Sequence, residues 1–274
     1  MLILIILFAL LDLFVILALL YVLWFIRPGK KWNPEHNALL CEYAHRGLHG
    51  NGVPENSLAA FSLACENGFG MELDVQLSRD GQVMVFHDYT LTRMTGMEKK
   101  LCELDADQLQ ALSLKGTDQT IPTFRQVLEL VNGRTPLLVE LKGETLNVEL
   151  CEKVAALLKD YPGTYCMESF NPLLVRKIRK LLPNVPCGQL YTNMCRRGRK
   201  KSIRNLLLSG MAFNFLAKPH FIAYNKKDRN FFPVRLSTKL YHAPRFVWTT
   251  KNEEELATAR ELGECAIFER SEEA

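Results

Sequence analysis

The stretch MELDVQLSRDGQVMVFHD, residues 71–88, decides how the rest of the chain is interpreted. It covers most of two apolar runs, Gly70–Val75 and Val83–Phe86, which are joined by a polar turn with the sequence SRDG. About seven residues separate the two runs, whereas a crossover between parallel strands needs about a dozen or more. The two runs are therefore predicted to form an antiparallel hairpin, which counts as one strand of a larger parallel sheet.

Short apolar runs alternate with helix-like segments along the rest of the chain. Strand candidates lie at residues 41–44, 136–141, 165–167, 187–191, 211–215, 246–248 and 265–268. Helix candidates lie at residues 57–67, 124–131, 148–158, 172–181, 202–208 and 253–262. This alternation is typical of an α/β protein with a parallel sheet covered by helices. With the hairpin counted once, the eight strand candidates predict a (β/α)8 TIM barrel. A doubly wound open sheet is the alternative, but no G-x-G-x-x-G follows the first strand.

The N-terminal segment, residues 1–26, differs from the rest in having one charged side chain, Asp12, and no Lys or Arg. Its length is sufficient to cross a bilayer core, which takes about 20 apolar residues. A cleaved signal peptide would need a basic start and small residues before the cleavage site. The chain instead has no basic residue at its start and bulky side chains at 23–25. A retained transmembrane anchor is therefore predicted.

The charges that flank this anchor predict its orientation. Arg27, Lys30 and Lys31 follow its C-terminal end, and no cation precedes it. Because positive charges favour the inner side of a membrane, the remaining domain is predicted to be cytoplasmic. The eight cysteines show no C-x-x-C spacing and are predicted to be free thiols. Residues 27–40 are interpreted as a polar linker and residues 41–274 as one domain.

The side chains with reactive chemistry cluster at the predicted strand ends, where TIM barrels hold their sites. They are His45, Arg46, Glu72, Asp74, His87, Glu140, Lys142 and Trp248. Glu72 and Asp74 are two residues apart on one strand, so both side chains point to the same face. Together with Glu140 they are predicted to converge on one rim of the barrel.

This set of side chains predicts phosphodiester cleavage. Three adjacent carboxylates raise each other's pKa unless a cation neutralises them, and oxygen ligands select Mg²⁺ or Ca²⁺. His45 and His87 suit general acid and general base roles near neutral pH, and the sequence leaves open which is which. Arg46 and Lys142 suit a phosphate anion.

The motifs in this order resemble the glycerophosphodiester phosphodiesterase family. Its H-R-G, P-E-N, E-x-D, H-D, E-x-K and W-T motifs are matched by AHRG, PENS, MELD, VFHD, VELK and WTT. The resemblance implies a (β/α)8 barrel that hydrolyses glycerophosphodiesters to an alcohol and glycerol 3-phosphate, and the anchor extends the expected substrates to lysophospholipids. Carried over to this chain, it implies His45 and His87 as the catalytic pair, Glu72, Asp74 and Glu140 as metal ligands, Arg46 and Lys142 as phosphate contacts, and Trp248 as a wall beside the glycerol moiety.

The C-terminal end departs from the family pattern. The family ends in a form of G-x-D-G-I-x-T-D-x-P, whereas residues 263–270 read GECAIFER. Cys265 replaces the first acid, Ala266 the glycine and Arg270 the second acid. The other motifs are intact, so the resemblance does not extend to substrate binding by the last strand alone.

Two cation-rich segments lie outside these motifs. Residues 196–204 contain the run RRGRKK, and residues 221–232 interleave aromatic residues with Lys226, Lys227 and Arg229. They are interpreted either as a solvated charged face or as a basic, aromatic lip that meets anionic lipid headgroups. Nucleic acid is not expected as a partner, because the chain has no recognisable motif for reading it.

Several roles are left as alternatives. An anchor followed by a linker and a barrel would also suit two other functions. One is a non-catalytic membrane-bound barrel that binds lipid headgroups, and the other is a phospholipase that acts on membrane lipids. Glu55 is expected to be structural or to support the site, Glu168 to lie on the surface or beside the site, and Asp88 to orient its neighbours. His49 has no motif around it and is interpreted as an ordinary polar histidine.

Overall fold

The computed structural model describes residues 1–29, 31–143, 146–196 and 202–270. Within these ranges nine strands form one sheet in the order β1-β9-β8-β7-β6-β5-β4-β2-β3, and β1 also pairs with β2. The strands are β1 (Tyr43–Ala44), β2 (Gly70–Leu77), β3 (Val83–Val85), β4 (Leu137–Leu141), β5 (Tyr165–Ser169), β6 (Cys187–Tyr191), β7 (Phe221–Asn225), β8 (Arg245–Thr250) and β9 (Cys265–Phe268). The β1–β2 pairing closes the sheet into a barrel.

The predicted hairpin is confirmed. Strands β2 and β3 pair antiparallel, with Val75 opposite Val85 and Leu77 opposite Val83. All other neighbouring strands pair in parallel, so β3 lies outside the closed ring. Among the described residues, eight parallel strands form the barrel, which confirms the predicted (β/α)8 architecture.

One predicted strand is wrong. Residues 211–215 do not enter the sheet, because Met211 adopts a positive φ of 52° and Asn214 begins a short helix. The place in the barrel is taken by the next apolar run, β7, which pairs with β6 and β8. The side chain of Asn214 is buried and donates a 2.9 Å hydrogen bond to the carbonyl of Ile26. This apolar run contains a buried amide side chain, and it forms a turn and the start of a short helix in place of a strand.

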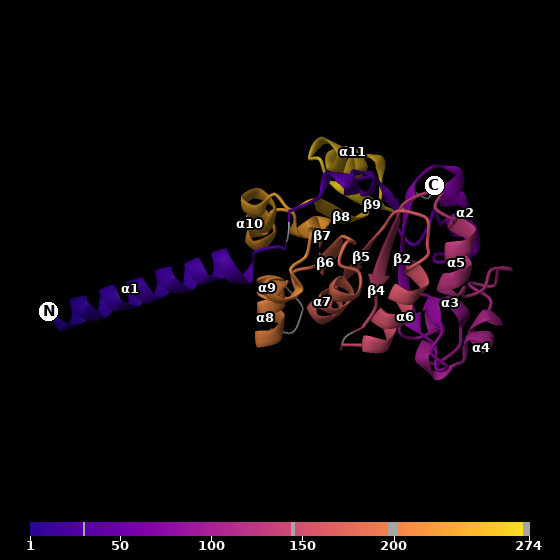
Figure 1. Ribbon diagram of the computed structural model, residues 1–274, viewed down its shortest axis with the longest axis horizontal. Helices are drawn as coiled ribbons and strands as arrows, with labels where there is room; N and C mark the ends of the chain where they lie inside the picture. The colour runs from indigo at the N-terminus through magenta and orange to yellow at the C-terminus, as the bar shows by residue number, and fades with distance from the viewer. Residues whose placement is uncertain (30, 144–145, 197–201, 271–274) are drawn as a thin grey trace.

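Helices connect the strands and cover the barrel (Figure 1). They are α1 (Leu2–Leu20), α2 (Leu58–Glu66), α3 (Thr92–Thr95), α4 (Ala106–Gln110), α5 (Phe124–Val131), α6 (Val148–Leu158), α7 (Pro172–Leu181), α8 (Ile203–Ser209), α9 (Asn214–Ala217), α10 (Phe232–Tyr241) and α11 (Glu253–Glu261). Polar caps fix their starts: Thr123, Asn147 and Asn171 each accept a hydrogen bond from a backbone amide in the first turn. The predicted bounds of α5, α6 and α7 match the structure.

The barrel interior changes from apolar to charged toward the carboxyl ends of the strands. On β4, Leu138 is fully buried in the interior cluster, and Glu140 follows two residues later on the same face. On β5, Cys166 and Glu168 repeat this order. The alternation of each strand therefore carries carboxylates to one end of the barrel, directly above an apolar floor.

The N-terminal helix projects away from the barrel (Figure 1). Helix α1 continues into a π-helical turn, η1 (Tyr21–Phe25), and Leu2–Phe25 is long and apolar enough to cross a membrane by length and composition. Its C-terminal end packs on the barrel: the Tyr21 hydroxyl donates to the Gly210 carbonyl at 2.7 Å, and the rings of Phe25 and Phe215 meet edge to face at 5.3 Å. Ile26 is fully buried.

The segment between this helix and β1 covers the other end of the barrel. It contains a 3-10 helix, η2 (Pro34–Leu39), in which Leu39 is buried. The Tyr43 hydroxyl donates a 2.8 Å hydrogen bond to the Leu39 carbonyl, and the Trp32 ring lies 6.3 Å from that of Phe221. The predicted linker residues therefore close the apolar floor of the barrel.

Candidate active site

Three carboxylates meet at the carboxyl end of the barrel. Glu72 and Asp74 come from β2 and Glu140 from β4, and the register places Asp74 directly beside Glu140. All three are buried, and one oxygen of each lies within 4.8 Å of the others. The convergence predicted from the sequence is therefore present in the fold.

Burial and mutual repulsion shape the protonation of this cluster. Burial, together with the charges of Asp74 and Glu140, raises the pKa of Glu72 well above its ordinary value. Burial raises the pKa of Glu140 to about 7, although the Lys142 ammonium opposes the shift. Burial alone would raise the pKa of Asp74 too, but Lys142, His87 and Arg46 outweigh it and lower that pKa. A divalent cation would relieve this repulsion, and the all-oxygen donor set fits a hard cation.

The two predicted phosphate-binding cations lie at the edge of the cluster. The Lys142 ammonium is 3.0 Å from Oδ1 of Asp74 and 2.8 Å from Oε1 of Glu140. The Arg46 guanidinium is 3.5 Å from Oδ2 of Asp74 and 2.6 Å from Oε1 of Glu55. The backbone amide of Arg46, held at a positive φ of 54°, donates to Oε2 of Glu72 at 2.9 Å. Both cations therefore lie where they could contact a phosphate bound to a metal ion at the carboxylates.

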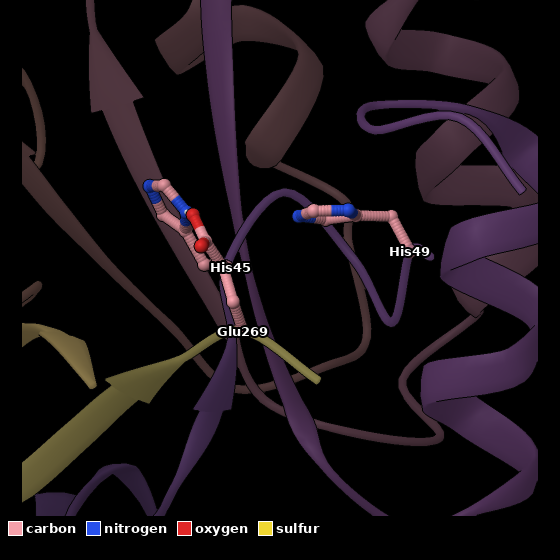
Figure 2. Close-up of side chains that lie close together, drawn as sticks. All are labelled: His45, His49 and Glu269. Atoms are coloured by element: carbon pink, nitrogen blue, oxygen red, sulfur yellow. The ribbon is translucent and has the colours of Figure 1, made fainter. Parts of the chain in front are cut away.

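His45 bridges the cluster and the last strand. Its Nε2 atom lies 3.9 Å from Oε2 of Glu72, and its Nδ1 atom lies 3.0 Å from Oε1 of Glu269. Figure 2 shows the side chains of His45 and Glu269 side by side, with the ring of His49 pointing toward them. Burial lowers the pKa of His45, and the hydrogen bond with Glu269 opposes this shift. Since a carboxylate accepts hydrogen bonds, Nδ1 carries the proton and Nε2 is left facing the carboxylate cluster.

Glu269 is a site residue that sequence reasoning missed. It takes the threonine position of the family's C-terminal motif, directly before Arg270. It also forms a 3.0 Å ion pair with Lys251. The sequence does carry a signal for this role: Glu269 is an acid at a motif position that is neutral in the family, and it lies at the end of a predicted strand. The interpretation of His49 as an ordinary histidine was also incomplete, because ligand atoms of His45, His49 and Glu269 lie within 4.8 Å of one another.

His87 is held by a chain of charged side chains. Its Nδ1 atom lies 2.6 Å from Oδ1 of Asp88, whose other oxygen is 2.6 Å from Nε of Arg93. Arg93 in turn pairs with Glu55 at 2.7 Å, and Glu55 pairs with Arg46. Asp88 therefore orients its neighbour, as expected. Glu55 ties the loop after β1 to helix α3, which agrees with a supporting role.

Two more polar groups complete the rim. Asn56 donates a 2.8 Å hydrogen bond to Oδ2 of Asp74 and fixes that carboxylate. Glu168 is 2 % exposed, so the expectation that it lies on the surface is wrong, while a place beside the site is consistent with its position opposite Glu140. Its Oε2 atom has no hydrogen-bond partner among the described residues, and burial raises its pKa well above the ordinary value.

A cavity of about 1000 Å³ opens beside these residues. His87, Glu140 and Lys142 line its polar end, and Trp248 stands beside them with its ring 5.7 Å from that of Phe170. The far end of the cavity is mostly apolar; its lining there includes Met194, Arg204, Leu208, Met211 and Phe213. The cavity therefore extends from the charged rim to side chains of α8 and of the turn before α9, most of which are apolar.

The predicted basic and aromatic lip is mostly wrong at residues 221–232. Phe221 and Tyr224 lie on β7 with buried side chains, because this segment is a barrel strand and not a loop. Arg229 pairs with Glu264 at 2.8 Å. Lys226 pairs with Glu255. Phe231 and Phe232 remain exposed.

In the other part of the predicted lip, residues 196–204, the charge is also partly neutralised. Arg196 forms an ion pair with Asp228, and Arg204 lines the large cavity. Residues 197–201, which hold most of the basic run, lie outside the described residues.

Comparisons with known proteins agree with this geometry. The model of the glycerophosphoryl diester phosphodiesterase family matches residues 45–269. A glycerophosphodiester phosphodiesterase of Caldanaerobacter subterraneus subsp. tengcongensis is 36 % identical over 159 residues, which cover 54 % of this chain and 65 % of that protein. Rat lysophospholipase D GDPD1 is 36 % identical over 131 residues, which cover 43 % of this chain and 40 % of the relative.

Solved structures extend the likeness to the whole barrel. A phosphodiesterase of Oleispira antarctica, in complex with the product sn-glycerol-3-phosphate, superposes with a TM-score of 0.68 at 25 % identity, covering 84 % of this chain and 92 % of that one. A glycerophosphodiester phosphodiesterase of Thermotoga maritima superposes with a TM-score of 0.64 at 26 % identity, covering 82 % and 92 %. The chain spans about two thirds of the length of the Caldanaerobacter protein, and the family match includes both predicted histidines and all three carboxylates. The chain belongs to the glycerophosphoryl diester phosphodiesterase family.

Proposed function

We propose that this protein hydrolyses glycerophosphodiesters to an alcohol and glycerol 3-phosphate, and lysophospholipids to an alcohol and acyl-glycerol 3-phosphate. The observation that carries the proposal is the buried cluster of Glu72, Asp74 and Glu140, which His45 and His87 flank at one end of a barrel. A barrel that only bound headgroups would gain nothing from two imidazoles held by carboxylates. The membership in the family and the product bound to the Oleispira phosphodiesterase support the same reaction.

Glu72, Asp74 and Glu140 would hold a divalent cation, Mg²⁺ or Ca²⁺. Such a cation would polarise the phosphoryl oxygens and neutralise charge that develops during displacement at phosphorus. The residues of the chain set its place: Asn56 orients Asp74, and the amide of Arg46 orients Glu72. Arg46 and Lys142 would contact the phosphate through charged donors that already face the cluster.

The two histidines would move protons on opposite sides of the phosphate. The tautomer that Glu269 favours leaves Nε2 of His45 able to accept a proton from water or from a substrate hydroxyl. The Asp88 carboxylate holds Nδ1 of His87 in the same way and leaves its Nε2 able to exchange a proton. The symmetry of these two arrangements supports an acid–base pair and leaves open which histidine acts first.

The cavity supports a substrate with an apolar tail. Trp248 would cover the glycerol moiety next to Lys142, and the apolar compartment beyond would receive one acyl chain of a lysophospholipid. The volume of about 1000 Å³ lies at the upper end of ordinary ligand pockets, which measure roughly 300–1,000 Å³. A free headgroup such as glycerophosphocholine would occupy the polar end alone.

The N-terminal helix would be a retained single membrane span with the barrel on the cytoplasmic side. Cleavage of this helix as a leader would remove Tyr21 and Phe25, which pack on the barrel. The Tyr241 hydroxyl also donates to the carbonyl of Val22 at 2.5 Å. These contacts support retention, and Arg27 with Lys31 at the barrel side supports the orientation.

The direct test is turnover of glycerophosphocholine, glycerophosphoethanolamine and lysophosphatidylcholine by the purified full chain. All three are expected to release glycerol 3-phosphate or its acyl derivative together with the free alcohol. Binding of these compounds without any release of alcohol would contradict the proposal and favour a headgroup-binding barrel. A cyclic phosphate product would show that a substrate hydroxyl, and not water, attacks the phosphorus.

A further inference from the structure

A second cavity lies where the N-terminal helix meets the barrel. It has a volume of about 530 Å³ and brings together two kinds of lining. Its apolar side includes Leu23 and Trp24 from the end of the helix. Its cationic side is formed by Arg27, Arg179 and Lys218, which come from three separate segments of the chain. Among the described residues this cavity shares no lining residue with the large cavity at the carboxylate cluster.

The walls of this second cavity are held by specific contacts. The backbone amide of Gly29 donates to the carbonyl of Pro219 at 2.7 Å. A Cβ atom at Gly29 would lie 2.3 Å from the carbonyl oxygen of Lys218, so only glycine permits this approach. The Nη1 atom of Arg179 donates to the carbonyls of Ala217 and Lys218, both at 2.9 Å. The chain after the apolar helix is therefore fixed against the α9–β7 connection.

Among the described residues, no carboxylate compensates the charge that lines this cavity. Within the described ranges, Arg27, Arg179 and Lys218 form no ion pair, and no Asp or Glu lines the cavity. Arg27 and Lys218 are exposed and Arg179 is partly buried, so all three cations are accessible to a ligand at this cavity. An anion bound there would meet like charges from three segments, and the forked guanidinium groups match a phosphate well.

The position of the cavity along the N-terminal helix identifies the kind of anion. Leu23 and Trp24 are 60 % and 63 % exposed, and they immediately precede Arg27 in the chain. At a membrane surface tryptophan occupies the interface and basic residues meet the headgroups. A ligand that fills the cavity would thus have an anionic head against the three cations and acyl chains along Leu23 and Trp24. Those are the features of an anionic phospholipid.

We propose that this cavity binds the headgroup of an anionic phospholipid from the membrane that α1 crosses. The inference rests on the retained span of the proposed function and not on the hydrolytic reaction. The bound lipid is not a substrate, since the cavity contains none of the histidines or carboxylates of the barrel rim. Its binding fixes the junction between the span and the barrel.

The test uses the full chain in nanodiscs of phosphatidylcholine that contain a minor fraction of phosphatidylglycerol. After transfer to detergent, native mass spectrometry measures which lipid stays bound. We expect the natural protein to retain phosphatidylglycerol and the double variant Arg27→Gln/Lys218→Gln to retain about tenfold less. The matched control is Arg176→Gln/Lys180→Gln, which removes the same charge from exposed positions on α7 that do not line the cavity. This control is expected to retain as much lipid as the natural protein.

Equal retention by both double variants would overturn the proposal, because it would assign the effect to general surface charge. Inorganic phosphate added to phosphatidylcholine nanodiscs is a second arm, and no rise in the thermal midpoint is expected from it. A rise as large as that caused by phosphatidylglycerol would replace the lipid with free phosphate and also overturn the proposal. Hydrolysis of glycerophosphocholine on the same samples is expected to be unchanged in both variants. That separate readout distinguishes a failure of the hydrolytic proposal from a failure of the lipid site.

Discussion

The Nδ1 atom of His45 donates a hydrogen bond of 3.0 Å to Oε1 of Glu269, which joins the residue after the first barrel strand to the residue after the last. The contact spans 224 positions of sequence. It fixes the ring of His45 with Nε2 toward Glu72, 3.9 Å away. The hydrogen bond with His45 lowers the pKa of Glu269 to about 2, so the carboxylate is ionised near neutral pH.

Replacing Glu269 with Gln tests whether this contact supports turnover. Because the amide can present an acceptor but no charge, we expect kcat to fall about 10–100-fold with little change in KM. Glu269→Asp should recover part of the loss. The measurement is steady-state hydrolysis of glycerophosphocholine. Lys251→Gln is the control, since Lys251 contacts Glu269 from an exposed position; normal kcat in Glu269→Gln would show that the contact is dispensable.

His45→Ala and His87→Ala test the acid–base pair. Each variant is expected to lose about 10²–10⁴-fold in kcat, as removal of a general acid or base does. A substrate with an activated alcohol should restore the rate in one of the two variants and not in the other. That variant lacks the general acid, because an activated alcohol leaves without a proton. Near-normal turnover of the natural substrate in either variant would contradict the role of that histidine.

Acid stability tests the charged chain that holds His87. Burial would raise the pKa of Glu55, but the hydrogen bonds and charges of Arg93 and Arg46 outweigh it and lower the pKa to about 2. The lowered pKa of Glu55 stabilises the folded state at pH values above 4.5, the ordinary pKa of a glutamate. This stabilisation is lost as the pH falls toward 2. The difference in thermal midpoint between the natural protein and Arg93→Gln should therefore be largest near neutral pH and shrink below pH 4.5. Arg125→Gln, an exposed change on α5, should show a small difference at every pH.

Membrane orientation is open to a labelling experiment. Cys102 is an exposed free thiol on the barrel. If the barrel is cytoplasmic, a membrane-impermeant maleimide should label Cys102 only after cells are permeabilised. Cys102→Ser identifies the signal that belongs to this residue. Labelling of Cys102 in intact cells would reverse the orientation.

The sequence predicted the barrel and most of the rim because these features follow from short sequence patterns and from general rules of strand geometry. The hairpin of β2 and β3 follows from a short polar turn between two apolar runs. The convergence of Glu72, Asp74 and Glu140 follows from strand alternation and from the rule that parallel strands end at one edge.

The features that could not be predicted depend on contacts distant in sequence. Glu269 reaches His45 only because β9 closes the barrel beside β1. The apolar run at 211–215 has no local sequence feature that distinguishes it from a strand. Its conformation depends on the hydrogen bond from the side chain of Asn214 to the carbonyl of Ile26, which is distant in sequence. At residues 221–232 the expected lip is mostly wrong for the same reason, since Glu264 forms an ion pair with Arg229 from the end of the next barrel repeat.

The central claim is that a divalent cation held by the three carboxylates is needed for hydrolysis. The most direct test measures release of glycerol 3-phosphate from glycerophosphocholine by the full chain, first in excess chelator and then after metal is added back. Glu72, Asp74 and Glu140 are buried at one point, and Lys142 and Arg46 offset only part of their repulsion, because the pKa of Glu72 and that of Glu140 stay raised. Excess EDTA is therefore expected to abolish release, and Mg²⁺ or Ca²⁺ to restore it. Glu72→Gln should leave the response to added metal weak, whereas Glu66→Gln, an exposed change on α2, should respond like the natural protein. Full release of glycerol 3-phosphate in excess EDTA would contradict the account.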